Sequence, residues 1–136
     1  MALAMPVHVA NPAAMKYGGS MQWIRADAIW DTGAQHCVIT RRFCARLKLS
    51  PRAKTSFVGV GGLVSGGTDV VYLSLSGDGD TFLIALAGVV ESLPGNVDML
   101  IGMDVITQGD FAVSTNEGII TVAFSPYPGK LKKLRK

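Results

Sequence analysis

The sequence predicts an all-β or mainly β domain. Of its 136 residues, 49% are apolar and only 17% are charged, which is the composition of an ordered chain and not of a disordered one. Many short apolar runs are separated by turn residues, among them 16 glycines, and this pattern is typical of short strands joined by tight turns. The length suits one domain with its own core and is too short for two lobes.

The first half is expected to contain several strands. In chain order we expect an edge strand at Pro6–Ala10, a loop at Asn11–Met21, a strand at Gln22–Trp30, extended chain at Val38–Ile39 and a strand at Lys54–Val60. Side chains of a strand alternate between its two faces. One face of the strand at Gln22–Trp30 is therefore expected to carry the apolar residues Ile24, Ala26, Ala28 and Trp30.

A short helix is expected after the extended segment at Val38–Ile39. Thr40 suits the N-cap of a helix at Arg41–Leu47, because its hydroxyl can accept a hydrogen bond from a free backbone N–H of the first turn. Phe43 and Leu47 are four residues apart and lie on one face of such a helix.

The second half is expected to continue with strands and end in a hairpin. Met103–Gln108 is expected to form a brief helix that Gly109 stops from the C′ position. The other expected elements are strands at Asp69–Ser76, Thr81–Val90 and Asp98–Ile101, turns at Gly77–Asp80 and Ser92–Asn96, and a hairpin that pairs Phe111–Ser114 with Ile119–Phe124 across Thr115–Gly118.

The positive charge is concentrated at the end of the chain. The net charge is +3, from 13 basic and 10 acidic residues, and five of the basic residues lie in the last seven positions. Without these five, the balance is eight basic against ten acidic residues, or −2. A nearly neutral body argues against nucleic acid as a partner. We expect residues 1–128 to form the folded domain and residues 129–136 to form a solvated, frayed basic tail.

The cysteines and histidines predict no disulfide framework and no metal site. Cys37 and Cys44 form no CxxC pair, and the only histidines are His8 and His36, so a four-ligand zinc site is hard to assemble. We expect free thiols, no cofactor and no metal. The sequence has no convincing secretory signal and no apolar stretch long enough to span a membrane. A cytoplasmic location is therefore expected.

Two motifs in the sequence indicate a function. Asp31-Thr32-Gly33-Ala34 follows an apolar run and occurs once, and the apolar segment Met99-Leu100-Ile101-Gly102 lies about seventy residues later. Together they resemble the signatures of retropepsin-like aspartic proteases, which are an Asp-Thr-Gly turn and an apolar segment ending in glycine that packs beneath it. The resemblance spans most of residues 22–110.

The resemblance implies a closed, mainly β acid-protease barrel with one or two short helices and a single lobe per chain. It implies an aspartic endopeptidase that acts as a homodimer on peptide or protein substrates, with Asp31 of each subunit in a shared dyad. Two adjacent carboxylates cannot both ionise, so the pair offers an acid and a base at once. Thr32 would lock the two active-site loops together, and Gly33 would let backbone approach the dyad.

The substrate-binding residues follow from the same resemblance. Ala34 is small enough to leave room for the substrate backbone, and Gln35 would line the cleft by its position. The glycine-rich segment Val60, Gly61 and Gly62 resembles the tip of the family's flap, a hairpin that closes over bound peptide.

The chain departs from the viral members of the family at two positions. Retroviral enzymes carry an acidic residue directly after the Asp-Thr-Gly-Ala motif and an arginine directly after the late glycine, whereas this chain has Gln35 and Met103. The loss of both partners suggests a different dimer interface, and the segment around Met103 is closer to cellular and bacterial members. The strand Ile119–Phe124 is a candidate for the dimer sheet.

Two other interpretations stay open at this point. A retropepsin-like dimer could bind peptides or serve as a scaffold with little or no catalytic activity. A small β-barrel that binds anionic ligands through the basic tail would explain the tail but not the motif at Asp31.

Overall fold

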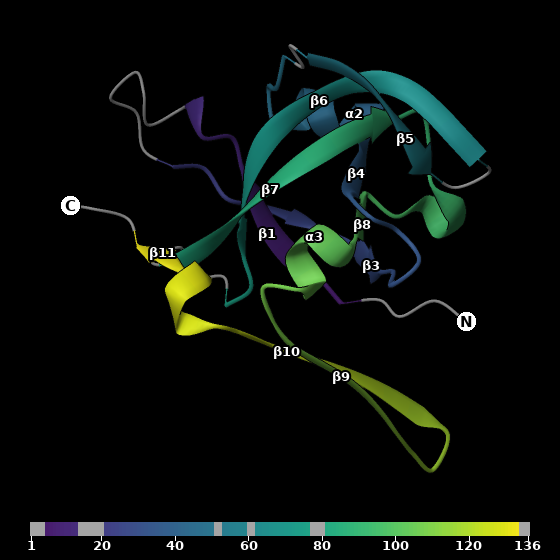
Figure 1. Ribbon diagram of the computed structural model, residues 1–136, viewed down its shortest axis with the longest axis vertical. Coiled ribbons are helices and arrows are strands. Elements are labelled where there is room, and N and C mark those ends of the chain that lie inside the picture. Colours follow the sequence, from purple (N-terminus) through teal and green to yellow (C-terminus); the bar gives the residue numbers. More distant parts are fainter. Residues whose placement is uncertain (1–4, 14–20, 51–52, 60–61, 77–80, 134–136) are drawn as a thin grey trace.

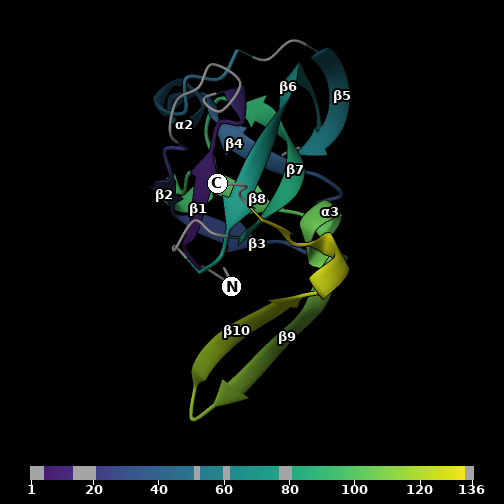
Figure 2. The same ribbon diagram turned by 90° about the vertical axis from the view of Figure 1, so that its left-hand side faces the viewer.

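A computed structural model describes residues 5–13, 21–50, 53–59, 62–76 and 81–133. The described strands form one nine-stranded sheet, which coils into a nearly closed barrel, and a two-stranded hairpin that projects from it (Figures 1 and 2). The strands of the sheet are β1 (Val7–Ala10), β2 (Ile24–Ala26), β3 (Ala28–Trp30), β4 (Cys37–Thr40), β5 (Ala53–Gly59), β6 (Gly62–Ser74), β7 (Thr81–Val90), β8 (Met99–Ile101) and β11 (Lys132–Lys133). The hairpin consists of β9 (Gly109–Asn116) and β10 (Ile119–Pro126).

The order of the strands in the sheet is β2-β1-β6-β7-β4-β8-β3, with β5 paired to β6 and β11 paired to β7. Two short helices, α2 (Arg41–Arg46) and α3 (Met103–Ile106), and two 3₁₀ turns (Pro94–Asn96 and Pro128–Lys130) complete the described elements. A mainly β fold with two short helices confirms the predicted fold class.

The expected strand Gln22–Trp30 is divided at Asp27, and this division closes the barrel. Before Asp27, the segment pairs as β2 with β1. After it, the segment pairs as β3 with β8, at the other end of the strand order. The predicted alternation is still present, because Ala26, Ala28 and Trp30 are all buried. Since β2 and β3 are one continuous piece of chain, the two ends of the sheet are joined at this point.

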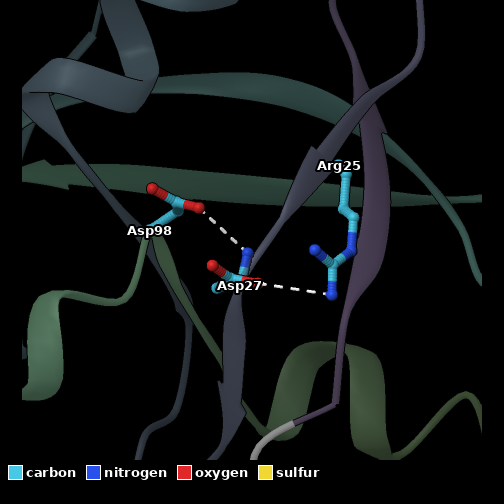
Figure 3. A network of polar contacts seen from close by, with 3 residues as sticks. All are labelled: Arg25, Asp27 and Asp98. Carbon is cyan, nitrogen blue, oxygen red and sulfur yellow. Dashed lines mark hydrogen bonds and ion pairs between the residues drawn. The ribbon is translucent and has the colours of Figure 1, made fainter.

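Reciprocal hydrogen bonds join Asp27 and Asp98 at this junction, and Figure 3 shows the one that the Asp98 carboxylate accepts. The Asp27 backbone N–H donates to Asp98 Oδ2 over 2.9 Å, and the Asp98 N–H donates to the Asp27 carbonyl over 2.8 Å. The Met5 N–H also donates to the Ala28 carbonyl over 3.0 Å, which links the segment before β1 to β3. Arg25 forms only an exposed ion pair with Asp27, at 3.6 Å, and such a pair contributes little stability.

The edge strand expected at Pro6–Ala10 is wrong in its position. β1 lies inside the sheet, with β2 on one side and β6 on the other. Val7 and Val9 are completely buried. A strand this short and apolar gains most when both of its hydrogen-bonding edges are satisfied.

The helix expected after Thr40 is confirmed. The Phe43 N–H donates to Thr40 Oγ1 over 3.1 Å, so the threonine caps α2 as its residue type suggests. Phe43 and Leu47 are both buried against the sheet. This helix follows β4 directly and covers the core beside it.

The expected role of Gly109 is wrong. α3 is a single turn, its C-cap is Thr107, and Gly109 is not among the glycines with positive φ. Instead Gly109 begins β9 opposite Pro126. A Cβ at this position would lie 2.7 Å from Pro126 Cα, so the glycine is needed for the close approach of two strands.

The last hairpin pairs as expected but turns more tightly. β9 and β10 remain paired up to Asn116 and Ile119. The turn is made by Glu117 and Gly118 alone, with φ values of 51° and 79°, as two-residue hairpin turns require. The hairpin extends away from the barrel (Figures 1 and 2), and most of its residues are exposed.

The basic tail is partly ordered, which corrects the expectation of a frayed end. Lys132 and Lys133 form β11 and pair with Phe82 and Thr81 of β7. Leu131 packs against the core. The expected domain boundary after residue 128 stays a prediction, and the turn expected at Gly77–Asp80 lies outside the described residues.

We expect the substitution Asp98→Ala to lower the free energy of unfolding by about 1 kcal/mol, because it removes the side-chain acceptor of the Asp27 N–H. Asp98→Asn keeps an acceptor oxygen and should stay close to the wild type. Denaturant unfolding of the three proteins measures both differences. Equal losses in the two variants would show that charge and not the hydrogen bond matters there.

Candidate active site

The candidate site is the loop at residues 31–36, which connects β3 to β4. In the sheet, β8 lies between these two strands, parallel to β3 and antiparallel to β4. The loop must therefore pass over the carboxyl end of β8, where Gly102 follows Ile101. This crossing brings the two sequence motifs together, although about seventy residues separate them.

Three backbone hydrogen bonds hold the loop in this position. The Asp31 N–H donates to the Ile101 carbonyl over 2.9 Å, directly before Gly102. On the other side, the Met103 N–H donates to the Ala34 carbonyl over 2.7 Å, and the Asp104 N–H donates to the Gln35 carbonyl over 3.1 Å. The loop is thus bonded to the end of β8 and to the first turn of α3.

Gly102 is required by the closeness of this packing. A Cβ at this position would lie 2.7 Å from the His36 carbonyl oxygen and 2.8 Å from the Ala34 carbonyl oxygen. Both neighbours are backbone atoms of the loop, so they could yield only if the loop itself moved. The glycine therefore allows the loop to rest on the end of β8.

The Asp31 carboxylate is oriented by its own turn. The Gly33 N–H donates to Asp31 Oδ1 over 2.8 Å, and the Ala34 N–H donates to the Asp31 carbonyl over 3.2 Å. The aspartate is half-buried, while Thr32 and Gly33 are exposed. The structure thus presents a fixed carboxylate at an open surface, and such a group can act as a general base towards water.

The remaining predicted residues lie in two places. Within the loop, Ala34 is buried and Gln35 is exposed. Val60 and Gly61 lie outside the described residues. Gly62 begins β6 and pairs with Gly59 of β5, so the backbone of the expected hairpin is present up to its tip. Their roles in substrate binding stay predictions.

The strand that leads into Asp31, β3, also contacts the projecting hairpin. Trp30 is almost completely buried and contacts Phe111 and Phe124, with ring centroids 5.7 Å and 5.0 Å away. Aromatic pairs at this spacing stabilise each other beyond the area that they bury. The base of the hairpin is therefore packed directly behind the Asp31 loop.

Sequence reasoning missed a side-chain contact that joins the loop to α3. The thiol of Cys37 donates to Asp104 Oδ1 over 3.1 Å, and the Val105 N–H donates to the same oxygen over 3.0 Å. Burial raises the pKa of the Cys37 thiol well above its ordinary value, and the nearby Asp104 raises it further. Cys37 was expected only as a free thiol; the available signal was an aspartate in the helix turn after Gly102.

In the described part of the chain, the His, Cys, Asp and Glu residues form no group of three or more that could hold a metal ion. No described helix is long and apolar enough to cross a membrane.

We expect Gly102→Ala to distort the loop and lower stability by about 1–3 kcal/mol, because the added methyl group overlaps two backbone carbonyls. Gly129→Ala is the matched control, since a Cβ there meets nothing within 4 Å. Thermal unfolding compares the two variants. A Gly102→Ala protein as stable as the control would contradict the close packing described above.

The raised pKa of Cys37 also predicts a pH dependence of stability. Between the ordinary thiol pKa of 9.0 and the higher folded value, the folded state keeps a proton that the unfolded state loses. The neutral thiol therefore makes its full contribution to the free energy of unfolding below that pH range. As the pH rises through the range, this contribution falls by at most about 1.4 kcal/mol per pH unit. Unfolding at pH values from about 8 to 10 should show a steeper decline for the wild type than for Cys37→Ala. Equal declines in the free energy of unfolding of the two proteins would contradict this pH dependence.

Comparisons with known proteins agree with this geometry. A family profile described as aspartyl protease matches residues 14–105, which include the Asp31 loop, β8 and the start of α3. No curated protein is significantly similar in sequence. Among solved structures, the retroviral protease-like domain of Ddi1 from Leishmania major is similar with a TM-score of 0.51 and 19% identity, over 93% of this chain and 95% of that one. At this identity the likeness shows the fold. The chain belongs to the aspartyl protease family and has its retropepsin-like fold.

Proposed function

We propose that this chain is an aspartic endopeptidase that works as a homodimer, with Asp31 of each subunit in one active site. The observation that carries the proposal is the Asp31 turn. A single carboxylate is held by the Gly33 N–H at 2.8 Å, on a loop packed over Gly102, with an exposed face beside it.

The chemistry follows from pairing two such carboxylates. One of them is ionised and takes a proton from a water molecule, whose oxygen attacks the carbonyl carbon of the peptide. The other is protonated and donates its proton to the carbonyl oxygen. When the carbon–nitrogen bond breaks, the carboxyl that took the proton from water gives it to the leaving nitrogen. The other carboxylate takes a proton back from a hydroxyl group of the tetrahedral intermediate, so the dyad returns to its starting state.

A second copy of the chain is the natural source of the second carboxylate. The motif occurs once, and a two-fold axis beside the loop would place two identical aspartates face to face. Thr32 and Gly33 are exposed at this surface, which leaves the loop accessible to a second copy. Thr32 would then contact its counterpart across the axis.

The substrate would lie between the loop and the β5–β6 hairpin. Figure 1 shows this hairpin arching over the barrel on the side of β4 and β8. Ala34 and Gln35 would form the floor of the cleft, and Val60, Gly61 and Gly62 its cover. A flap that closes over the peptide would exclude water from the dyad.

We expect Asp31→Asn to reduce peptide cleavage by at least about a hundredfold, because the amide cannot act as the base. Asp27→Asn is the matched control, since it removes a carboxylate from the same segment but at the far end of β3. A fluorogenic peptide library compares the purified proteins. Equal cleavage by the wild type and Asp31→Asn would refute the assignment. A wild type that binds peptides without cleaving any would identify a peptide-binding scaffold instead.

Mixing experiments test the dimer. If subunits exchange freely, random pairing in an equal mixture of wild type and Asp31→Asn leaves only about a quarter of the dimers with two wild-type subunits. Only these dimers should be active if cleavage needs both carboxylates. Cleavage should therefore fall more steeply than the wild-type fraction at constant total protein. A proportional fall, with exchange confirmed by a labelled subunit, would show that one chain is sufficient.

A further inference from the structure

We propose that the hydrogen bond between Cys37 and Asp104 holds the catalytic loop on α3, and that Asp104 is a positioning residue for the cleavage proposed above. The inference rests on that proposed function for its effect on catalysis. Its structural part, the attachment of the loop, can be tested separately.

The contact lies where the loop ends and β4 begins. Cys37 is the first residue of β4 and is completely buried. Its thiol is 3.1 Å from Asp104 Oδ1, in the first turn of α3. The backbone bonds of Met103 and Asp104 reach the loop only at Ala34 and Gln35. The side-chain bond therefore joins the exit of the loop to α3, in addition to the pairing of Cys37 with Ala87 of β7.

The buried position of the Asp104 carboxylate is not explained by a gain in the stability of the fold. Its Oδ2 atom is buried and has no hydrogen-bond partner among the described residues. A buried carboxylate oxygen without a donor lowers stability, and each such group in a folded protein calls for an explanation. A role in holding the loop provides such an explanation, because Asp104 Oδ1 accepts hydrogen bonds from both the Cys37 thiol and the Val105 N–H.

Asp104 is itself held from a second direction. The Gln108 side-chain amide donates to the Asp104 carbonyl over 2.9 Å and to the Ile84 carbonyl of β7 over 3.3 Å. The turn of α3 is thus attached to a long central strand of the sheet. A loop that is bonded to Asp104 is bonded through it to the rigid part of the barrel.

The bond between Cys37 and Asp104 lies close to Gln35 and Met103, which form no ion pair with each other. Neither Gln35 nor Met103 has a side chain that could form one with the other. The two segments are nevertheless joined at the neighbouring residues, by a neutral thiol that donates to a carboxylate. The thiol stays neutral because burial raises the pKa of Cys37.

The geometry of the dyad makes such an attachment important for catalysis. A displacement of reacting groups by about 1 Å can lower a rate by about a hundredfold. Only five residues lie between Asp31 and Cys37, and the carbonyls of Ala34 and Gln35 accept hydrogen bonds from the first turn of α3. Movement at the Cys37 end would therefore be transmitted to the Asp31 carboxylate.

The test uses five variants of the full chain. Cys37→Ala and Asp104→Ala each remove the bond, and the double variant removes both partners. Asp104→Asn keeps the carbonyl oxygen that accepts both hydrogen bonds. Cys44→Ala is the matched control, because Cys44 is also a buried thiol of the core, but its contact to the Leu49 carbonyl is a weak one at 3.9 Å.

We expect kcat on a library-derived fluorogenic peptide to fall by about tenfold in Asp104→Ala, with KM little changed. Asp104→Asn should restore most of the rate. The double variant should be no worse than the poorer single variant, because both remove the same bond. Cys44→Ala should keep the kcat of the wild type at a similar loss of melting temperature.

Amide hydrogen exchange gives a readout that does not depend on cleavage. Exchange at the Met103 and Asp104 amides, which donate to the loop, should accelerate in Asp104→Ala and Cys37→Ala but not in Asp104→Asn or Cys44→Ala. If the wild type cleaves no peptide, the proposed function fails while this comparison still decides the attachment. Unchanged exchange in both alanine variants, or a kcat in Asp104→Asn as low as in Asp104→Ala, would overturn the proposal.

Discussion

The hydrogen bonds between the Asp31 loop and the end of β8 are the constraint on which the rest of this structure depends. Asp31 donates to Ile101, and Met103 donates back to Ala34, so the chain is bonded on both sides of Gly102. This arrangement requires β8 to lie between β3 and β4. It therefore determines the strand order β4-β8-β3 at one end of the sheet as well as the position of the carboxylate.

The barrel serves to keep this crossing in place. Behind the loop, Trp30 fills the core and packs on Phe111 and Phe124, while at the start of β3 the chain changes partner at Asp27 and closes the sheet. Both ends of the three-residue strand β3 are thus immobilised by tertiary contacts. A strand this short would not be stable alone, and its rigidity comes from the elements on either side.

Local patterns in the sequence predicted local structure well. The alternation through Ala26 and Trp30, the threonine cap at Thr40 and the short helix after Gly102 all depend on neighbouring residues, and the structure contains each of them. The errors concern partners that are distant in sequence. β1 is an interior strand because β2 pairs with it, and Gly109 is a glycine because Pro126 approaches it, and neither partner can be recognised from the local pattern.

By itself the sequence determined the class of fold, the two motifs and the identity of the candidate catalytic carboxylate, because residue type and spacing suffice for these. Only the tertiary structure decided that the motifs meet over Gly102, that Gln22–Trp30 divides at Asp27, and that Cys37 and Asp104 join the loop to α3. The physical reason is that these contacts link residues about seventy positions apart. Their formation depends on the register of the sheet, which is set by the packing of the whole core and not by any one segment.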